Sequence, residues 1–434
     1  MRFAFQTLGC KVNQYETQAM EEILLSRGHT LAPFEGQADV YIINSCTVTA
    51  VSDKKSRQTV RQARKRAPGA IVALCGCYPQ VSPEEAAKLE ADLIGGSGDR
   101  MGFLTLLEQM AENRQKTVAV DDAFQRRTFE YLPAGGLEGR TRAMLKVEDG
   151  CTNFCSYCII PYARGPVRSL PLDQAAGEAK RLAHLGYQEL VVTGIEISSY
   201  GRDLEGRPTT ADLMETLCRA VPQMRVRIGS LEPRTVTEEF CERLAQFPNL
   251  CPHFHLSMQS GCDATLARMK RKYDTARYYR SVELLRQHFD RPGITTDMIV
   301  GFPGETQEEF AQTLDFIQKC GFSQMHIFPY SRRQGTPAAA MPGQLTTAEK
   351  AERARRGAEV AKAMGRSWLT SWLGETVEVL FEEEKEGFWR GYTPQYMEVK
   401  VTSQDNLHNL FRRVKVTAAG EDQVFGTLVE EEKP

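Results

Sequence analysis

A chain of 434 residues with a net charge of −2, 41% hydrophobic and 25% charged residues has the composition of a folded globular protein. This length exceeds what one hydrophobic core normally organises, so we expect two or three domains. The N-terminal MRFAFQTLGC becomes polar too early for a secretory signal peptide, and no apolar run approaches the roughly 18 residues of a membrane span. We therefore expect a cytoplasmic protein in which the twelve cysteines are poor candidates for disulfides and several of them are placed to bind metal.

The first part of the chain alternates strand and helix patterns. Residues 3–8, 39–44 and 70–75 are short apolar runs with amphipathic helical stretches between them. This β-α-β-α-β order predicts a parallel sheet. The segment YLPAGGLEGRTR, at residues 131–142, is rich in Gly and predicts a linker. We therefore expect an N-terminal α/β domain over residues 1–130.

Six further strand-like runs follow, separated by amphipathic helical segments. Six β/α units predict a partial (β/α)6 barrel over residues 140–372, with the active site at the C-terminal ends of its strands. The six runs are AMLKVE, ELVVTG, RVRIGS, HFHLSM, TTDMIV and QMHIF.

The last segment, residues 373–434, is patterned as five short strands after a long helical stretch. A small closed β-barrel of the oligonucleotide-binding kind accommodates such a pattern. The predicted fold class is therefore α/β, with an N-terminal parallel α/β domain, a central partial barrel and a small C-terminal all-β barrel.

The stretch GCTNFCSYCIIP, at residues 150–161, carries three cysteines in C-x3-C-x2-C spacing directly after the first barrel strand. A closed structural zinc or iron–sulfur site uses four protein ligands, and no fourth cysteine follows nearby. Cys151, Cys155 and Cys158 therefore favour a [4Fe-4S] cluster whose fourth iron stays open for a small molecule. A zinc site completed by a distant His is the alternative, because the chain holds seven histidines.

A second group of cysteines is scattered in sequence. Cys10, Cys46 and Cys77 each end a predicted strand, and parallel strands present their carboxyl ends at one edge of a sheet. We expect these thiols to converge and to bind a second [4Fe-4S] cluster with one open iron, and ordinary buried cysteines are the alternative. Strand alternation directs Cys75 to the same face as Cys77, so Cys75 is a core residue or a spare ligand.

The C-x3-C-x2-C loop, with Tyr157 before its last cysteine and at the end of a first barrel strand, resembles the radical S-adenosylmethionine (SAM) superfamily. The resemblance implies that the open iron binds SAM and that the reduced cluster cleaves it to methionine and a 5′-deoxyadenosyl radical. Glu196 stands where the resemblance leads us to expect a neutral polar residue or His. The implied cofactor contacts are Tyr157, Gly194, Glu196, Ser230, Glu232, Gln259, Asp297, Ile299, Gly301 and Pro303.

Two three-cysteine groups and a C-terminal β-barrel together resemble the methylthiotransferases, radical SAM enzymes that insert a sulfur and a methyl group into an unactivated C–H bond. The resemblance covers essentially the entire chain. It implies that one SAM methylates a sulfur held at the Cys10/Cys46/Cys77 cluster, and that a second is cleaved at the other cluster to activate C2 of an adenine. Matching stretches are LGCKVNQYE, NSCTVT, GCYPQ, CTNFCSYCIIPYARG, SLEP, HLSMQSG, RMKRKY and PYSRRQGTPA.

Within that family, LGCKVNQYE and TGI-x2-SSYG are most similar to the branch acting on N6-threonylcarbamoyladenosine beside the tRNA anticodon. Other branches modify an isopentenyladenosine of tRNA or a ribosomal-protein aspartate, and both stay open as alternatives. A different class, a non-enzymatic iron–sulfur protein that binds RNA, requires a fourth protein ligand on each cluster. We expect a monomer that works with tRNA, an electron donor and a sulfur source.

Basic side chains at two places predict RNA contacts. Lys54, Arg57, Arg61 and Arg64 share one face of a predicted helix and suit phosphate binding, although a solvated helix face is the alternative. The C-terminal barrel resembles the RNA-binding (TRAM-like) barrel of the family, and its basic residues gather on one predicted strand. Those residues are Arg412, Arg413 and Lys415.

Overall fold

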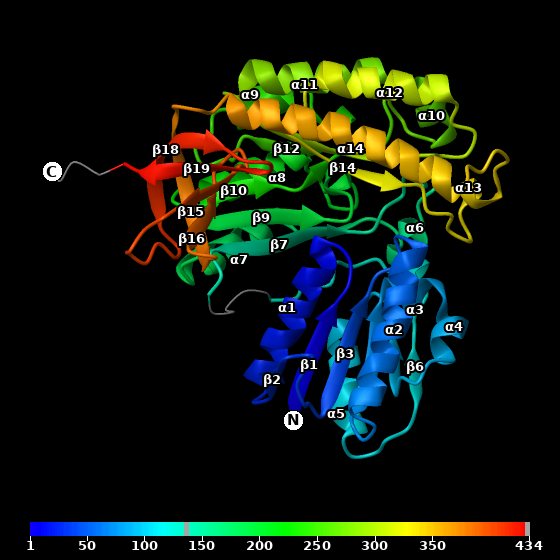
Figure 1. Cartoon of the computed structure of the whole chain (residues 1–434). Coiled ribbons are helices and arrows are strands. Elements are labelled where there is room, and N and C mark those ends of the chain that lie inside the picture. The colour runs from blue at the N-terminus through cyan, green and yellow to red at the C-terminus, as the bar shows by residue number, and fades with distance from the viewer. Residues whose placement is uncertain (134–138, 430–434) are drawn as a thin grey trace.

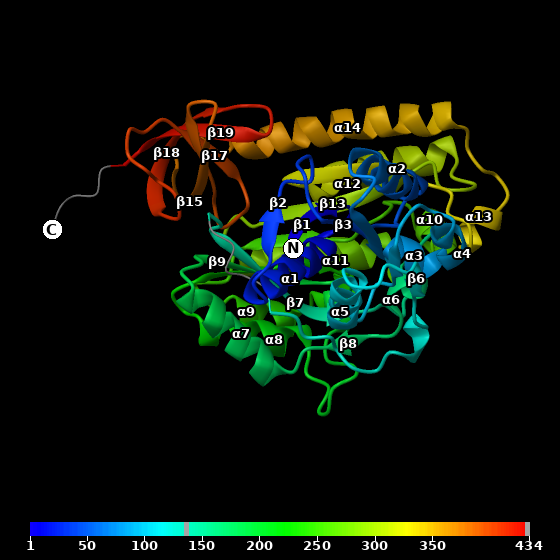
Figure 2. The same cartoon turned by 90° about the horizontal axis from the view of Figure 1, so that it is seen from below.

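A computed structural model of the protein describes residues 1–133 and 139–429. Figures 1 and 2 show an N-terminal α/β region, a central partial barrel and a small C-terminal β-barrel at the far end of the central one. The linker predicted at residues 131–142 includes residues 134–138, which lie outside the described residues. No helix among the described residues is both long and apolar enough to span a bilayer.

The N-terminal region is a six-stranded parallel sheet in the order β2-β1-β3-β4-β5-β6. Helices α1 and α5 cover one face and α2 covers the other, so the central strands β3 and β4 are buried along their whole length. The predicted parallel α/β arrangement is confirmed. Its elements are β1 (Arg2–Thr7), α1 (Lys11–Ser26), β2 (Thr30–Ala32), β3 (Val40–Ser45), α2 (Ala50–Arg66), β4 (Ile71–Gly76), α3 (Cys77–Val81), α4 (Pro83–Ala87), β5 (Leu93–Gly95), α5 (Arg100–Met110), β6 (Thr117–Ala119) and the 3-10 turn η1 (Ala123–Gln125).

The first half of the central barrel is a sheet in the order β10-β9-β7-β8, in which β7, β9 and β10 are parallel. Alternate side chains of these strands pack outward against the helices, and the others face the barrel interior. Its elements are β7 (Arg142–Asp149), α6 (Ile160–Arg164), β8 (Arg168–Ser169), α7 (Leu172–His184), β9 (Glu189–Gly194), η2 (Ile197–Ser199), α8 (Thr210–Ala220) and β10 (Arg225–Ile228).

The second half is a parallel sheet in the order β11-β12-β13-β14. The run predicted as one strand at residues 225–230 is divided between β10 and β11 by Gly229, where a Cβ atom would come within 2.8 Å of Val192 O and of Ile197 Cδ1. Its elements are β11 (Ser230–Leu231), η3 (Pro233–Thr235), α9 (Glu238–Leu244), β12 (His253–Leu256), α10 (Asp263–Arg268), α11 (Thr275–His288), β13 (Gly293–Val300), α12 (Gln307–Cys320), β14 (Gln324–Pro329), α13 (Pro337–Ala340) and α14 (Thr347–Thr370).

The C-terminal region is a closed five-stranded barrel, as predicted, in the order β15-β16-β17-β19-β18. It contacts the central barrel at the amino ends of the strands, where Arg142 and Arg225 pair with its Glu382 and Glu378. The N-terminal region lies below the central barrel in Figure 1, and its α1 pairs through Glu16 with Lys146 of β7 and with Arg164 after the cysteine loop. The start of α1 also reaches the amino ends of the strands, where Lys11 lines a cavity with Tyr396 of the C-terminal barrel. Its strands are β15 (Thr376–Lys385), β16 (Phe388–Tyr392), β17 (Glu398–Val401), β18 (Phe411–Ala419) and β19 (Gln423–Leu428).

Candidate metal centres

The first cysteine group lies in the loop after β7, as its sequence position predicts. Gly150 opens the loop with a φ of 97°, and a Cβ atom there would lie 2.0 Å from Pro166 O, so only glycine fits. The backbone then turns through hydrogen bonds from Cys151 N to Gly165 O at 3.0 Å and from Cys158 N to Cys155 O at 2.9 Å. This tight loop gathers the three cysteines at the carboxyl end of the barrel.

The thiols of this loop influence one another electrostatically. Burial raises the pKa of Cys158 to about 12, and the neighbouring Cys155 adds to that rise. Burial also raises the pKa of Cys151, with Glu196 and the other two cysteines contributing. Metal binding to such thiols displaces their protons, and three cysteines gathered in one loop supply the thiolates that an iron–sulfur cluster requires. The donor set therefore fits an iron–sulfur cluster.

Arg271, which the sequence analysis did not select as a site residue, lies beside this loop. Arg271 Nη1 donates to Cys155 Sγ at 3.2 Å, and its guanidinium lies 4.9 Å from the ring centre of Tyr273. Tyr273 in turn donates to Ser257 O at 2.5 Å, which connects the cysteine loop to the end of β12. Arg271 belongs to the basic run RMKRK, but spacing alone gave no sign that it faces a cysteine.

Several of the residues predicted to contact the cofactor lie near this loop. Glu196 accepts from Asn153 Nδ2 at 3.0 Å, and both Glu232 and Cys151 influence it electrostatically. Tyr157 packs edge-on against Phe302, with ring centres 6.4 Å apart. Gly194 lies against Glu148, where a Cβ atom would come within 2.8 Å of Oε2.

The remaining predicted contacts are more dispersed. Gln259, with a φ of 67°, donates its backbone N–H to Asp297 O at 2.9 Å, and Asp297 Oδ2 lies 3.4 Å from His255 Nε2. Ile299 shares the interior face of β13 with Asp297. Gly301 packs against Lys350 of the outer helix α14. Ser230 is exposed on β11, and Pro303 is buried in the loop after β13.

The second cysteine group forms at the carboxyl edge of the N-terminal sheet. Cys10 is the residue before α1, Cys46 follows β3, and Cys77 begins α3. Gly9 has a φ of 115°, and a Cβ atom there would lie 3.1 Å from Cys46 Sγ, which shows how closely the first two loops approach. Burial raises the pKa of Cys77 to about 12, with Cys46 and Cys10 contributing to the rise. The structure therefore brings together the three cysteines predicted to converge.

Cys75 does not join this group, contrary to the strand-alternation argument. Gly76 adopts a φ of 101°, and a Cβ atom there would meet Ser45 O at 2.4 Å, so the chain turns sharply before Cys77. Cys77 is consequently helical and Cys75 remains in β4, where it is fully buried in the core with α1 and α5. Burial raises the pKa of Cys75 to about 11. Its side chain lies in the core beside the buried charges of Arg100, Glu16 and Arg164, apart from the three converging cysteines.

Among residues 1–133 and 139–429, no three His, Cys, Asp or Glu side chains are close enough to hold one metal ion. A cubane cluster sets a different requirement, because each of three thiolates binds a separate iron and the sulfurs surround the whole cluster. Both cysteine groups match that requirement in ligand type. The zinc alternative needs a histidine beside one group, and no such grouping occurs in the described part of the chain.

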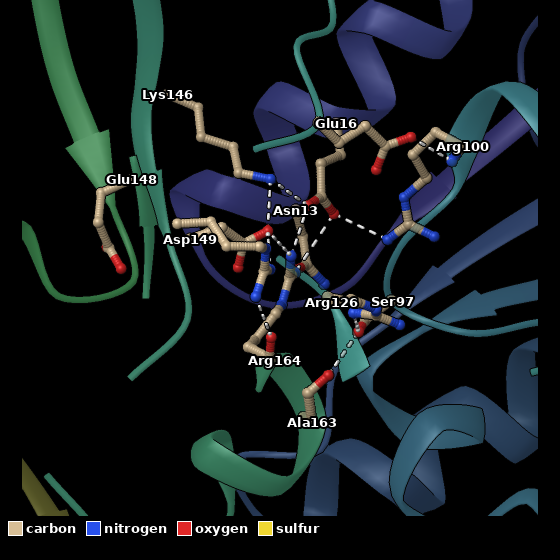
Figure 3. A network of polar contacts seen from close by, with 12 residues as sticks. Asn13, Glu16, Ser97, Arg100, Arg126, Lys146, Glu148, Asp149, Ala163 and Arg164 are labelled. Carbon is tan, nitrogen blue, oxygen red and sulfur yellow. Dashed lines mark hydrogen bonds and ion pairs between the residues drawn. The ribbon is translucent and has the colours of Figure 1, made fainter. Parts of the chain in front are cut away.

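A buried ion network joins the two cysteine-bearing regions (Figure 3). Glu16 of α1 is 1% exposed and pairs with Arg100 at 2.8 Å, with Lys146 at 3.0 Å and with Arg164 at 2.5 Å. Burial alone would raise the pKa of Glu16, but these three cations outweigh it and hold the pKa well below its ordinary value. Arg100 belongs to the N-terminal region, whereas Lys146 and Arg164 belong to the barrel. The network therefore ties the sheet edge to the barrel mouth.

The residues predicted to contact RNA have mixed surroundings. Lys54 and Arg61 are exposed on α2, but Arg64 pairs with Asp92 at 2.6 Å and donates to Ala70 O at 2.9 Å. Arg57 Nη1 lies at the limit of a hydrogen bond to Tyr78. On β18 the side chains alternate, so Arg413 and Lys415 are exposed together while Arg412 is half-buried on the other face.

Comparison with family models and known proteins adds independent findings. A model described as "Radical SAM superfamily" matches residues 145–317, and one described as "Uncharacterized protein family UPF0004" matches residues 2–96. Threonylcarbamoyladenosine tRNA methylthiotransferase MtaB of Bacillus subtilis is 38% identical over 438 residues, which is 99% of this chain and 97% of that protein. The tRNA-2-methylthio-N(6)-dimethylallyladenosine synthase of Symbiobacterium thermophilum is 33% identical over 445 residues, which is 99% of this chain and 94% of that protein.

Solved structures share the fold at lower identity. The radical S-adenosylmethionine methyltransferase TsrM from Kitasatospora setae matches with a TM-score of 0.58 and 15% identity, over 90% of this chain and 80% of that one. The radical enzyme OxsB matches with a TM-score of 0.52 and 12% identity, over 83% of this chain and 56% of that one. These likenesses show the partial-barrel fold.

Proposed function

The chain belongs to the radical SAM methylthiotransferases that modify tRNA, and from that membership we propose that its substrate is N6-threonylcarbamoyladenosine beside the anticodon. The product is the adenosine that carries a methylthio group at C2. The Bacillus subtilis relative is named for this substrate, which favours it. The Symbiobacterium thermophilum relative is named for dimethylallyladenosine, so the same chemistry on an isopentenyl-type adenosine is the second candidate.

Family membership establishes SAM and one [4Fe-4S] cluster as cofactors. We further propose that Cys10, Cys46 and Cys77 hold a second cluster, and that two SAM molecules are consumed for each product. When bound, the reduced cluster and SAM supply a radical that removes hydrogen from a carbon without a leaving group. Cys151, Cys155 and Cys158 would hold the cluster that binds SAM, and each group leaves one iron free for a small ligand.

The observation that carries this proposal is the position of the two cysteine groups. One lies at the carboxyl edge of the N-terminal sheet and the other at the carboxyl end of the barrel, and the buried network of Glu16 joins the two edges. A methylthiotransferase needs its sulfur source beside the carbon that the radical activates. Two cysteine groups flanking one junction support such an arrangement, with the substrate base unstacked between them.

The partners follow from the same proposal. We propose residues 1–130 as the domain of the second cluster, 140–372 as the SAM-binding barrel and 373–434 as the RNA-binding barrel. Lys54 and Arg61 on α2, with Arg413 and Lys415 on β18, are the exposed cations best placed for tRNA phosphates. The reaction also requires an electron donor and a sulfur source, and we propose that the enzyme acts as a monomer.

The test uses tRNA from cells that lack this modification. The reconstituted protein is incubated with dithionite, a sulfide source and SAM, and the digested tRNA is analysed by mass spectrometry. We expect C2-methylthio-N6-threonylcarbamoyladenosine, together with equal amounts of 5′-deoxyadenosine and S-adenosylhomocysteine. Methylthiolation of isopentenyladenosine instead would select the second candidate. If 5′-deoxyadenosine formed but neither nucleoside changed, a ribosomal-protein aspartate would be the next substrate to test.

The two-cluster part of the proposal has its own measurement. The parent and the Cys151→Ala/Cys155→Ala/Cys158→Ala variant are reconstituted anaerobically, and iron and sulfide are counted. About eight irons in the parent and about four in the variant are expected for two cubane clusters. About four in the parent and none in the variant would leave only the SAM-binding cluster and contradict the second one.

A further inference from the structure

Arg164 contacts both sides of the junction between the two cysteine-bearing regions. It ends α6, in the segment that follows Cys158, and its side chain is fully buried. Its Nη1 donates to Glu16 Oε1 at 2.5 Å, and its Nη2 donates to Asn13 Oδ1 at 2.8 Å. Both partners lie on α1, which begins directly after Cys10. Its Nε is buried and has no hydrogen-bond partner among the described residues, so this guanidinium keeps one donor available.

Asn13 extends the contact of Arg164 to the cysteine loops of the N-terminal sheet. Its Nδ2 donates to Leu8 O and to Ser45 O, both at 2.9 Å, and these carbonyls precede the loops of Cys10 and Cys46. Helix α3, which begins at Cys77, packs against α6, which ends at Arg164. One side chain therefore borders all three loops.

The network around Arg164 holds more buried cations than carboxylates. Four cations share two carboxylates, and a third carboxylate, Glu130, accepts from the backbone N–H of Arg100 at 2.5 Å. Among the described residues Glu148 pairs with none of these cations: its Oε2 accepts from the backbone N–H of Glu196 at 2.6 Å, and burial raises the pKa of its carboxyl group. Within this ion-paired group of described residues the cations therefore outnumber the carboxylates they pair with, and an unbalanced buried positive charge is costly unless an anion compensates it. The four cations are Arg100, Lys146, Arg164 and Arg168, and the two shared carboxylates are Glu16 and Asp149.

We propose that the cluster held by Cys10, Cys46 and Cys77 is the compensating anion, and that Arg164 positions its three loops and raises its reduction potential. This inference rests on the proposed function, because it requires the second cluster. Three thiolates make a [4Fe-4S] cluster anionic, and reduction adds one further negative charge. A neighbouring cation in a dry environment therefore stabilises the reduced form more than the oxidised form.

The test uses the full chain with the Cys151→Ala/Cys155→Ala/Cys158→Ala background, which keeps only the second cluster. Iron and sulfide are counted after anaerobic reconstitution, and the midpoint potential is measured by redox titration followed by electron paramagnetic resonance. Arg164→Gln is expected to disfavour reduction at least tenfold, which is about 59 mV for a one-electron couple. Arg164→Lys keeps the charge and should recover most of the potential. Glu16→Gln removes a competing carboxylate and should shift the potential upward.

Arg333 offers a matched control at the same junction. It lies in the loop after β14 and is similarly buried. Its Nη1 donates to Asp53 Oδ2 at 2.5 Å, and its Nη2 donates to Thr47 Oγ1 at 2.7 Å, next to Cys46. Because Arg333 and Asp53 pair one to one, the double variant Arg333→Gln/Asp53→Asn changes no net charge. The midpoint potential of the cluster should therefore equal that of the background protein.

Different outcomes separate the two levels of the proposal. If the background protein and its Arg164→Gln variant have equal potentials, the inference is overturned, but the second cluster is still supported. The same holds if the Arg333→Gln/Asp53→Asn control lowers the potential as much as Arg164→Gln does. A background protein that binds no iron overturns the second cluster itself. If Arg164→Gln binds no cluster, the Glu16→Gln measurement decides, and an unchanged potential there overturns the inference.

Discussion

The two ends of the central barrel are joined to their neighbours in different ways. At the carboxyl ends of the strands the N-terminal sheet is held by charged side chains that water does not reach, since Glu16, Lys146 and Arg164 are each at most 1% exposed. At the amino ends the ion pairs to the C-terminal barrel stay partly exposed to water, and the buried Arg227 adds hydrogen bonds to the carbonyl oxygens of Thr393 and Pro394. Arg225 lies 2.7 Å from Glu378, whose side chain is 57% exposed.

Cations over aromatic rings add to the C-terminal junction. Arg225 lies 4.6 Å from the ring centre of Phe411, and Arg142 lies 4.8 Å from that of Tyr392. A cavity of about 370 Å³, lined by Arg142 and Tyr396 among others, remains between the parts. Removing one partner of a buried ion pair costs much stability, because the remaining charge stays buried without a partner. Removing one partner of an exposed pair costs little stability, because water solvates the remaining charge. The stricter junction is the one that bears the cysteines.

The largest expected effect separates two cysteines of the N-terminal sheet. Cys77→Ala is expected to abolish methylthiolation of tRNA and to halve the iron content, because the proposed second cluster loses a ligand. SAM cleavage to 5′-deoxyadenosine should persist. Cys75→Ala is the matched control, and it should keep both activities at a stability cost of about 1 kcal/mol for the small cavity. Loss of iron from Cys75→Ala would place Cys75 among the ligands after all.

The next effect tests whether the N-terminal junction depends on its central carboxylate. Glu16→Ala leaves three buried cations without their shared partner, so we expect the free energy of unfolding to fall by about 3–5 kcal/mol. Chemical denaturation of the protein without cofactors measures this change. Glu85→Ala removes an exposed carboxylate that pairs with Lys88 on the surface, and it should leave stability unchanged. Similar losses in both variants would contradict the distinction between dry and wet pairs.

A smaller effect concerns acid and the C-terminal junction. His253 is buried against Tyr396, with ring centres 5.0 Å apart, and burial holds its pKa well below 6.5, with Arg227 contributing. Below about pH 6.5 the unfolded chain therefore binds a proton that the folded protein does not, and the free energy of unfolding falls as pH falls.

His253→Phe should reduce the stability difference between pH 7 and pH 5 by about 2 kcal/mol, which denaturation at both pH values measures. His184→Gln, an exposed change on α7, serves as the control. An unchanged pH dependence in His253→Phe would show that protonation of His253 does not destabilise the folded protein.

The smallest effect concerns the outer surface of the C-terminal barrel. Removing Arg413 and Lys415 together should weaken tRNA binding and reduce the slope of log affinity against log salt by about 2, or about 1 for each phosphate contact. Filter binding over a range of salt concentrations measures it. Arg412→Ala, on the other face of β18, should leave the slope unchanged. Equal slopes in all variants would remove this barrel from the RNA contact.

The sequence predicted the architecture well because each region has its own periodicity. Period-2 and period-3.6 patterns were sufficient for the parallel sheet, the partial barrel and the closed barrel, all of which are confirmed. The site was predictable where its residues are local, as in the loop of Cys151. The positions of Cys10, Cys46 and Cys77 followed from strand ends. The identities of the cluster ligands stay predictions.

The ion network was missed for a physical reason. Lys146 and Glu148 alternate with Leu145 and Val147, a pattern that usually indicates a strand with one wet face. In this fold the polar face lies inside the barrel and is closed off by the N-terminal sheet, so burial depends on an association that local pattern does not encode. The orientation of Cys77 was also predicted incorrectly. The prediction assumed that strand alternation continues through Gly76, but the positive φ of Gly76 ends the strand before Cys77.

The network of Glu16 also has a consequence for synthesis of the protein on the ribosome. The partners of Glu16 lie 84, 130 and 148 residues further along the chain. A nascent chain therefore exposes the thiols of Cys10, Cys46 and Cys77 long before Arg164 emerges to complete the junction. A cluster bound by these three thiols, as proposed above, would therefore have freer access to them during that interval than after Arg164 completes the junction.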